Sequence, residues 1–207
     1  TAKELSLFRN DIPLNEKKIT SEVCIHHLWF SSKDYTSKGT HIKWNPAIKT
    51  ERDREALWKG LNSDFLDILA TDHAPHTIEE KSRTYEKAPS GGPLVQHSLP
   101  ALLTAYHKQK ITLEKIVEKA CHNPAILFDI KDRGFIREGY FADLVIIDLD
   151  QEQTIKKEDL LYKCGWSPFE GNVFKGIVEK TLLNGRLVNH RGEIHPKSAA
   201  MALKFDR

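Results

Sequence analysis

The stretch Thr71-Asp72-His73-Ala74-Pro75-His76 follows a short apolar run, Ile68-Leu69-Ala70, and it decides how the rest of the chain is interpreted. An apolar run of this length is typical of a buried strand. Pro75 favours an extended conformation at Ala74, so the strand is not expected to continue directly into a helix. An aspartate and two histidines therefore leave the strand together at its carboxyl end. In α/β barrels, that end of each strand carries the chemistry. The alternative is a polar turn whose aspartate caps the next helix.

Two other polar strand ends precede this one. Residues 21–30 are predicted to form a strand with His26 and His27 near its end, and residues 40–44 a short extended segment that ends at Asn45-Pro46. Helices are predicted over residues 2–10 and 51–62. Strands alternating with helices indicate a parallel sheet with His26, Asn45 and Asp72 at one edge. The alternative for the histidine pair is that one ring is packed and the other is exposed.

A long polar segment, residues 77–93, follows the central stretch and contains Ser90-Gly91-Gly92-Pro93. Loops of this length within a domain often cover an active site, and glycines allow the backbone to approach a ligand closely. A flexible connector is the alternative reading.

The second part of the chain has a different pattern. Residues 142–148 and 176–183 are rich in β-branched residues and predict strands. Asn184-Gly185 predicts a two-residue hairpin turn that leads into a third strand over residues 186–189. We expect a boundary near Asp129, which divides the chain into residues 1–129 and a β-rich part, residues 130–207. Residues 191–207 show little pattern.

Composition narrows the functional class. The formal net charge of the 207 residues is +2, which does not indicate a nucleic-acid surface. No apolar run approaches the roughly 20 residues that cross a bilayer, so we expect no membrane segment. The three cysteines are widely spaced and include no Cys-x-x-Cys pair, which excludes a disulfide framework and favours a reduced, cytoplasmic location.

Five motifs occur in the order Glu22-Val-Cys-Ile-His-His-Leu, Lys43-Trp-Asn-Pro, Thr71-Asp-His-Ala-Pro-His, Ala142-Asp-Leu-Val and Ser167-Pro-Phe-Glu-Gly. Together they resemble the dihydroorotases, a branch of the cyclic amidohydrolases, over nearly the whole chain. The resemblance implies an α/β fold: the C-terminal part of a distorted (β/α)8 TIM-like hydrolase barrel, plus part of a small composite β-sandwich domain. It also implies one or two zinc ions and the interconversion of N-carbamoyl-L-aspartate and L-dihydroorotate in pyrimidine biosynthesis.

The resemblance assigns roles to individual residues. His26 would bind zinc, with His27 as its packing neighbour. Asp72 would bind zinc and act catalytically, carrying a proton from the attacking water to the leaving nitrogen, as a carboxylate can. His73 receives no role. The small-molecule substrate would be contacted by Asn45, His76 and the loop residues Ala88, Pro89, Ser90, Gly91 and Gly92.

Several family features are absent from this sequence: a His-x-His pair, a bridging carboxylate or carbamylated lysine, a further histidine ligand, and an arginine that binds the substrate carboxylate. Residues 1–5 resemble those that follow a metal-binding histidine. We therefore expect this chain to be the C-terminal half of such an enzyme, with the missing half or a second copy as its partner. Because a catalytic zinc takes three protein ligands, the chain alone should be inactive. Two alternatives stay open: an enzyme for hydantoin or allantoin, and a non-catalytic scaffold subunit.

Overall fold

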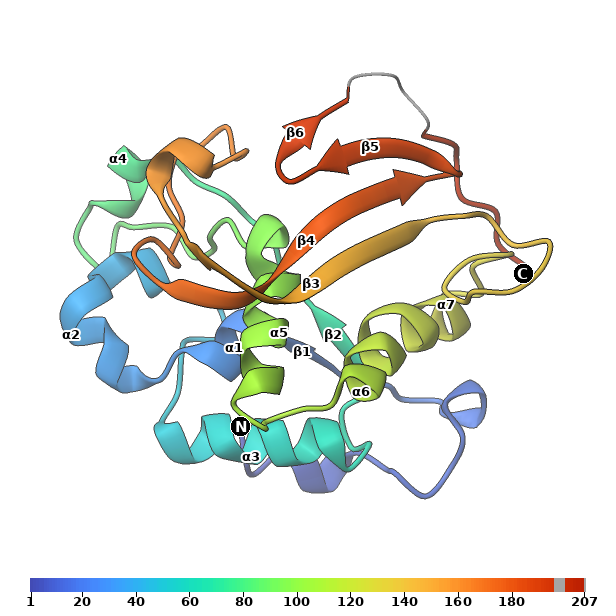
Figure 1. Cartoon of the computed structure of the whole chain (residues 1–207). Helices are drawn as coiled ribbons and strands as arrows, with labels where there is room; N and C mark the ends of the chain where they lie inside the picture. Colours follow the sequence, from blue (N-terminus) through green and yellow to red (C-terminus); the bar gives the residue numbers. More distant parts are fainter. Residues whose placement is uncertain (196–199, 207) are drawn as a thin grey trace.

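The structure is a computed structural model that describes residues 1–195 and 200–206, and it has two parts (Figure 1). A helical part surrounds a pair of short strands, and a four-stranded sheet lies beside it. The chain is thus a mixture of helices and strands, as the sequence predicts. Among the described residues, no helix has the length and apolar character needed to cross a bilayer.

The two short strands are parallel and in register. Strand β1 (Glu22–Cys24) pairs with β2 (Ile68–Ala70), so that Cys24 lies opposite Ala70. The carboxyl ends of both strands consequently lie at the same edge, and the residues that follow them emerge together. The predicted strand over residues 68–70 and its parallel pairing are both confirmed.

The predicted strand over residues 21–30 is wrong beyond Cys24, because α1 (Ile25–Trp29) begins there. Helix α1 buries Ile25 and Leu28, three positions apart, on one face. The Leu28 carbonyl also accepts a hydrogen bond from Trp58 Nε1 at 3.0 Å, which anchors the helix to α3 (Glu51–Asn62). Tertiary packing therefore outweighs the strand-like alternation of residues 21–25, and His26 and His27 lie on a helix.

Two further predictions about the first part are wrong. Residues 2–10 contain a 3-10 turn, Leu5–Leu7, instead of a regular helix, and residues 40–44 overlap a 3-10 helix, Gly39–Ile42, instead of a strand. The predicted helix over residues 51–62 is confirmed, and Thr50 caps it by accepting a hydrogen bond from the Asp53 N–H at 3.2 Å. The other helices are α2 (Tyr35–Lys38), α4 (Ile78–Lys81), α5 (Ser98–His107), α6 (Leu113–Val117) and α7 (Asn123–Leu127), with a π-helical turn at Glu118–His122.

The second sheet is antiparallel, in the order β3 (Leu144–Thr154), β4 (Val173–Leu183), β5 (Arg186–His190) and β6 (Glu193–Ile194). The predicted Asn184-Gly185 turn is confirmed, with φ values of 50° and 78°. Strand β6 lies within residues 191–207, which show little pattern in the sequence. The β-rich character of this part is therefore confirmed, with one more strand than predicted.

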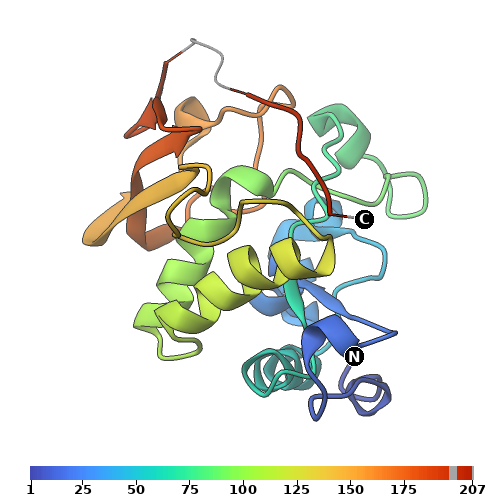
Figure 2. The same ribbon diagram turned by 90° about the vertical axis from the view of Figure 1, so that its right-hand side faces the viewer.

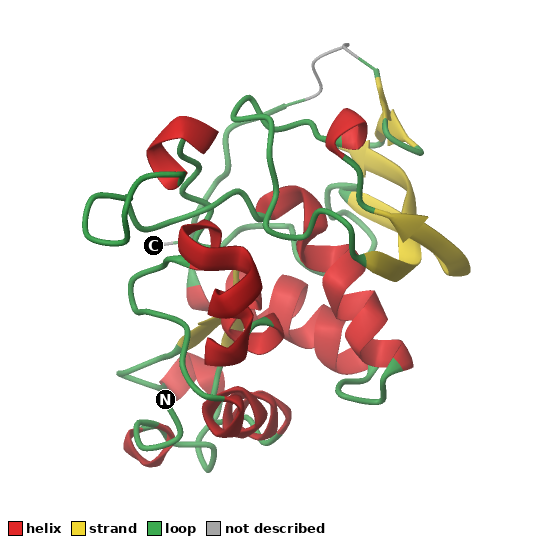
Figure 3. Cartoon of the chain, turned by 90° about the vertical axis from the view of Figure 1, so that its left-hand side faces the viewer, coloured by secondary structure: helices red, strands yellow, loops and turns green. Residues whose placement is uncertain are grey.

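Helix α5 lies between the sheet and the parallel strand pair (Figures 1 and 3). At Gly176 of β4, an added Cβ would be 2.7 Å from the Leu103 Cβ, so only glycine permits this approach of strand and helix. Aromatic rings continue the core: Trp29 of α1 meets Phe174 of β4 edge-on at 5.2 Å between centroids. Figure 2 shows the molecule turned by 90°, with α5 next to the sheet.

Candidate active site

The residue that would act at the end of β2, Asp72, is exposed to solvent, and we call this strand end open. Asp72 follows the strand by two residues, has a φ of 46° and is exposed. Aspartate tolerates this left-handed conformation better than most residues. Its carboxylate lines a cavity of about 710 Å³, which is also lined by Cys24, His27 and Asn45. Residues at or after β1, β2 and the Gly39–Ile42 helix thus contribute polar groups to one cavity.

At the end of β1 the corresponding residue, His26, is buried, and we call this strand end closed. The ring of His26 is 0% exposed and stacks on Trp44, with the centroids 4.5 Å apart and an interplanar angle of 13°. Within the described part of the chain, neither ring nitrogen has a hydrogen-bond partner. Burial lowers the pKa of His26 to about 2, His27 lowers it further, and the Thr71 backbone opposes the shift. His26 is not among the residues that line the Asp72 cavity.

The ring of His27 lies next to that of His26, with the centroids 4.2 Å apart. It lines the Asp72 cavity, and its Nε2 lies 3.1 Å from the Pro46 carbonyl oxygen. A carbonyl oxygen only accepts, so Nε2 carries the hydrogen and Nδ1 retains a lone pair. Burial lowers the pKa of His27, which favours the neutral ring that binds metals. The sequence assigned His27 only a packing role.

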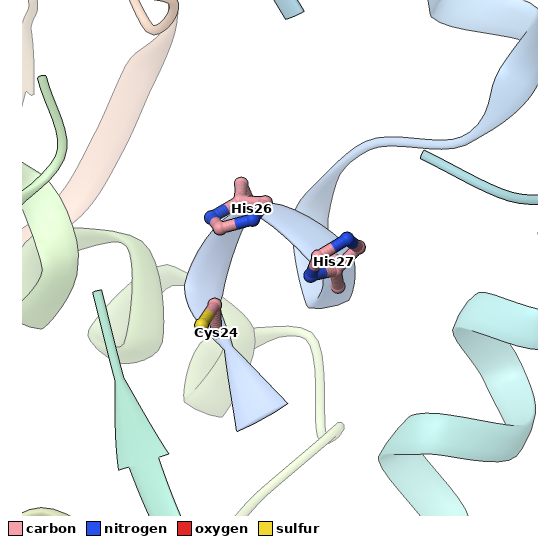
Figure 4. Close-up of side chains that lie close together, drawn as sticks. All are labelled: Cys24, His26 and His27. Carbon is pink, nitrogen blue, oxygen red and sulfur yellow. The ribbon is translucent and has the colours of Figure 1, made fainter. Parts of the chain in front are cut away.

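Cys24, His26 and His27 form a compact group where β1 turns into α1 (Figure 4). Their ligand atoms all lie within 4.8 Å of one another. Thiolate and imidazole are the usual zinc ligands, and the His26 nitrogens have no competing partner, so the chemistry of the group fits zinc. Cys24 is a residue that the sequence interpretation missed. The signal was its position two residues before a histidine pair at a strand end.

His76 lies outside the Asp72 cavity. Its Nε2 is 3.0 Å from the Ser90 carbonyl oxygen, and its Nδ1 is 3.7 Å from Glu80 Oε2. It lines a second, larger cavity of about 1280 Å³, together with His73 and Tyr162. The structure therefore brings Asn45 and Asp72 together, but it places His76 against the loop and not beside them.

The loop over residues 88–92 is held by hydrogen bonds within the chain. The five consecutive carbonyl oxygens each have one partner: Ala88 O from Lys43 Nζ at 2.7 Å, Pro89 O and Gly91 O from Lys81 Nζ at 2.9 and 2.8 Å, Ser90 O with His76 Nε2 at 3.0 Å, and Gly92 O from the Ala74 N–H at 3.3 Å. The loop is thus an ordered structure, not the flexible connector that the sequence left as an alternative.

His73 also takes part in this arrangement. Its Nδ1 accepts hydrogen bonds from the Leu94 and Val95 N–H groups at 3.0 and 3.3 Å, and its backbone forms a parallel bridge with Gly92. His73, to which the sequence assigned no role, therefore holds the residues that follow the 88–92 loop in place.

Residues 11–188 match the Amidohydrolase family. The chain belongs to the amidohydrolase family. It is 40% identical over 194 residues to a dihydroorotase of Pyrococcus furiosus, covering 94% of this chain and 44% of that protein. A dihydroorotase of Halobacterium salinarum is 41% identical over 170 residues, covering 82% of this chain and 40% of that protein. This amidohydrolase chain therefore spans less than half the length of these relatives.

Solved structures of two kinds resemble this amidohydrolase chain. An L-hydantoinase (dihydropyrimidinase) from Arthrobacter aurescens matches with a TM-score of 0.86 at 28% identity, over 94% of this chain and 44% of that one. The inactive dihydroorotase-like domain of the Chaetomium thermophilum CAD-like multifunctional protein matches with a TM-score of 0.66 at 25% identity, over 94% and 50%. A structure named as a hydantoinase and one named as an inactive domain thus share this arrangement, so fold alone does not decide activity.

Proposed function

We propose that this chain is the C-terminal half of a zinc-dependent dihydroorotase, which interconverts L-dihydroorotate and N-carbamoyl-L-aspartate. The observation that carries the proposal is the cavity at the carboxyl end of the parallel strands, which the exposed Asp72 and Asn45 both line. Identities of about 40% to dihydroorotases over most of the chain support the substrate class. In this proposal the cavity belongs to a (β/α)8 barrel that the missing N-terminal half completes.

Asp72 is the proposed catalytic residue and zinc ligand. Its exposed carboxylate can accept a proton from the attacking water and deliver it to the leaving ring nitrogen. Asn45 both donates and accepts hydrogen bonds, which suits a ring with alternating N–H and C=O groups. Bound zinc would lower the pKa of a water towards 7 and polarise the ring carbonyl.

His26 remains the proposed second zinc ligand, but its neighbours limit where the metal can lie. Its nitrogens are unpartnered, but its ring is stacked on Trp44 and lies outside the Asp72 cavity. His27 and Cys24 line that cavity and lie within ligand distance of His26. We infer that zinc, if shared with Asp72, is held through this Cys-His-His group, and the remaining ligands come from the missing half.

Turnover by the intact protein tests the proposal. With zinc present, we expect hydrolysis of dihydroorotate to exceed that of hydantoin and allantoin, and we expect residues 1–207 alone to be inactive. Faster turnover of hydantoin would favour the function in the name of the Arthrobacter aurescens relative. No turnover of any of the three by the zinc-loaded protein would favour a non-catalytic subunit, like the inactive domain of the Chaetomium thermophilum protein.

A further inference from the structure

Lys81, the last residue of α4, has a buried ammonium group that is bound entirely by backbone carbonyls. Its side chain is 0% exposed, and Nζ donates to Lys43 O at 3.0 Å, Pro89 O at 2.9 Å and Gly91 O at 2.8 Å. An ammonium has three hydrogens, so all three are used. Burying a charged group costs free energy unless hydrogen bonds compensate it. The three carbonyls provide that compensation, so we ask what this arrangement holds in place.

The three carbonyls belong to the two segments that carry predicted substrate contacts. Lys43 lies two residues before Asn45, and residues 89–91 are the centre of the predicted substrate loop. The Gly91 N–H donates to Lys43 O at 3.0 Å, so that this carbonyl accepts from both the loop and Lys81. One ammonium group thus joins the Asn45 segment to the loop.

The same contacts fix which way the loop faces. In a planar trans peptide, the C=O of one residue and the N–H of the next point in opposite directions. Because Pro89 O points at Lys81, the Ser90 N–H points away from it. At Gly91, where φ is +117°, an added Cβ would lie 2.5 Å from Ala74 O, so the loop is packed closely against the segment that follows β2.

We propose that Lys81 is a positioning residue that sets the distance and orientation of the 88–92 loop relative to Asn45. This inference rests on the proposed function for its substrate, but not for its geometry. In the described part of the chain Lys81 forms no ion pair with a carboxylate, and burial, together with the nearby Lys43, lowers its pKa to about 8. In this position the lysine contributes its three donors, which no uncharged side chain of similar length supplies.

The test compares Lys81→Met with Lys119→Met in the intact protein. Lys119 is equally buried, at 1% exposed, but its Nζ lies 2.8 Å from Asp64 Oδ1 and 3.4 Å from Glu118 Oε1, away from the loop. Both variants should lower Tm. In Lys81→Met we expect the Gly91 amide to exchange its hydrogen at least about tenfold faster, and KM for dihydroorotate to rise about tenfold with a smaller change in kcat. Lys119→Met should leave both readouts unchanged.

Unchanged Gly91 exchange in a folded Lys81→Met variant would overturn the positioning role, as would a KM equal to that of Lys119→Met. If Lys81→Met does not fold, Lys81→Arg replaces it: the charge and donors stay, but a planar guanidinium cannot direct its hydrogens as an ammonium does. We expect a near-normal Tm with a raised KM, and an unchanged KM would again contradict the proposal. If the wild-type protein does not hydrolyse dihydroorotate, the proposed function fails, while Gly91 exchange still decides the role of Lys81.

Discussion

The ends of β1 and β2 lie side by side in one parallel pair, yet the side chains that follow them differ in their exposure to solvent. After β1 the chain turns at once into a helix that carries His26 into the core, at 0% exposed. After β2 the chain turns at Asp72 without entering a helix, and Asp72 is exposed on a cavity. The segment that follows a strand, and not the strand end itself, therefore decides whether a side chain can reach a ligand.

The sequence explains both outcomes. Ile25 and Leu28 supply an apolar helical face at the end of β1, so burial of that face takes His26 with it. At the end of β2, Pro75 opposes a helix, and the hydrogen bonds of Ala74 and His73 tie the segment to the 88–92 loop and its following residues. The comparison predicts that substitutions at the β2 end affect chemistry first, whereas substitutions at the β1 end affect stability first.

The largest expected effect is at the open end. In the intact protein, Asp72→Asn should reduce kcat for dihydroorotate by about 10³-fold, because an amide cannot carry the proton. Asparagine also tolerates the left-handed backbone, so Tm should change little. The matched control is Asp129→Asn, since Asp129 is exposed with a φ of 53° and is not among the residues that line the cavity. Equal activity of the two variants would contradict the catalytic role of Asp72 at the open strand end.

The closed end should respond in stability. His26→Ala removes a fully buried ring that stacks on Trp44, and we expect a loss of about 3 kcal/mol in unfolding free energy, measured by urea denaturation. His27→Ala at the cavity wall should cost about 1 kcal/mol or less.

Zinc content of the same two variants adds a second readout, measured on the intact protein. A loss of zinc in His26→Ala, at preserved fold, would show that the buried ring binds metal, and that burial at the β1 end does not exclude a ligand role. A loss of zinc in His27→Ala alone would instead assign the ligand to the residue that already lines the cavity.

Sequence reasoning succeeded where the signal is local. The apolar run at residues 68–70 and the Asn184-Gly185 turn each depend on a few adjacent residues, and both are confirmed. It failed at α1, because five residues are too short to show a helical period. The contacts of Lys81 join residues 8 to 38 positions apart, and His76 meets Ser90 across 14 positions. Such contacts exist only once the chain has folded, so the residue pattern predicted the loop but not its hydrogen bonds.

His97 provides a smaller, independent test of what burial does to a histidine. It is 3% exposed like a core residue, but its Nδ1 has polar neighbours that His26 lacks: Ser167 Oγ at 3.2 Å and Tyr162 Oη at 3.5 Å. Burial lowers the pKa of His97 from 6.5 to about 4. The unfolded chain therefore binds the proton more readily, and stability that is present above pH 6.5 should be lost as the pH falls towards 4, by about 2–3 kcal/mol.

The control for this titration is His97→Asn, whose side-chain oxygen can accept the Ser167 hydrogen bond but does not titrate. Carboxylates titrate in both proteins, so the difference between the two unfolding curves isolates the histidine. The wild-type protein should lose more stability than His97→Asn between pH 6.5 and 4. Parallel curves would mean that the Ser167 and Tyr162 hydroxyls stabilise the protonated ring of His97. Burial would then prevent protonation of a histidine only where no hydroxyl lies beside the ring, as at His26.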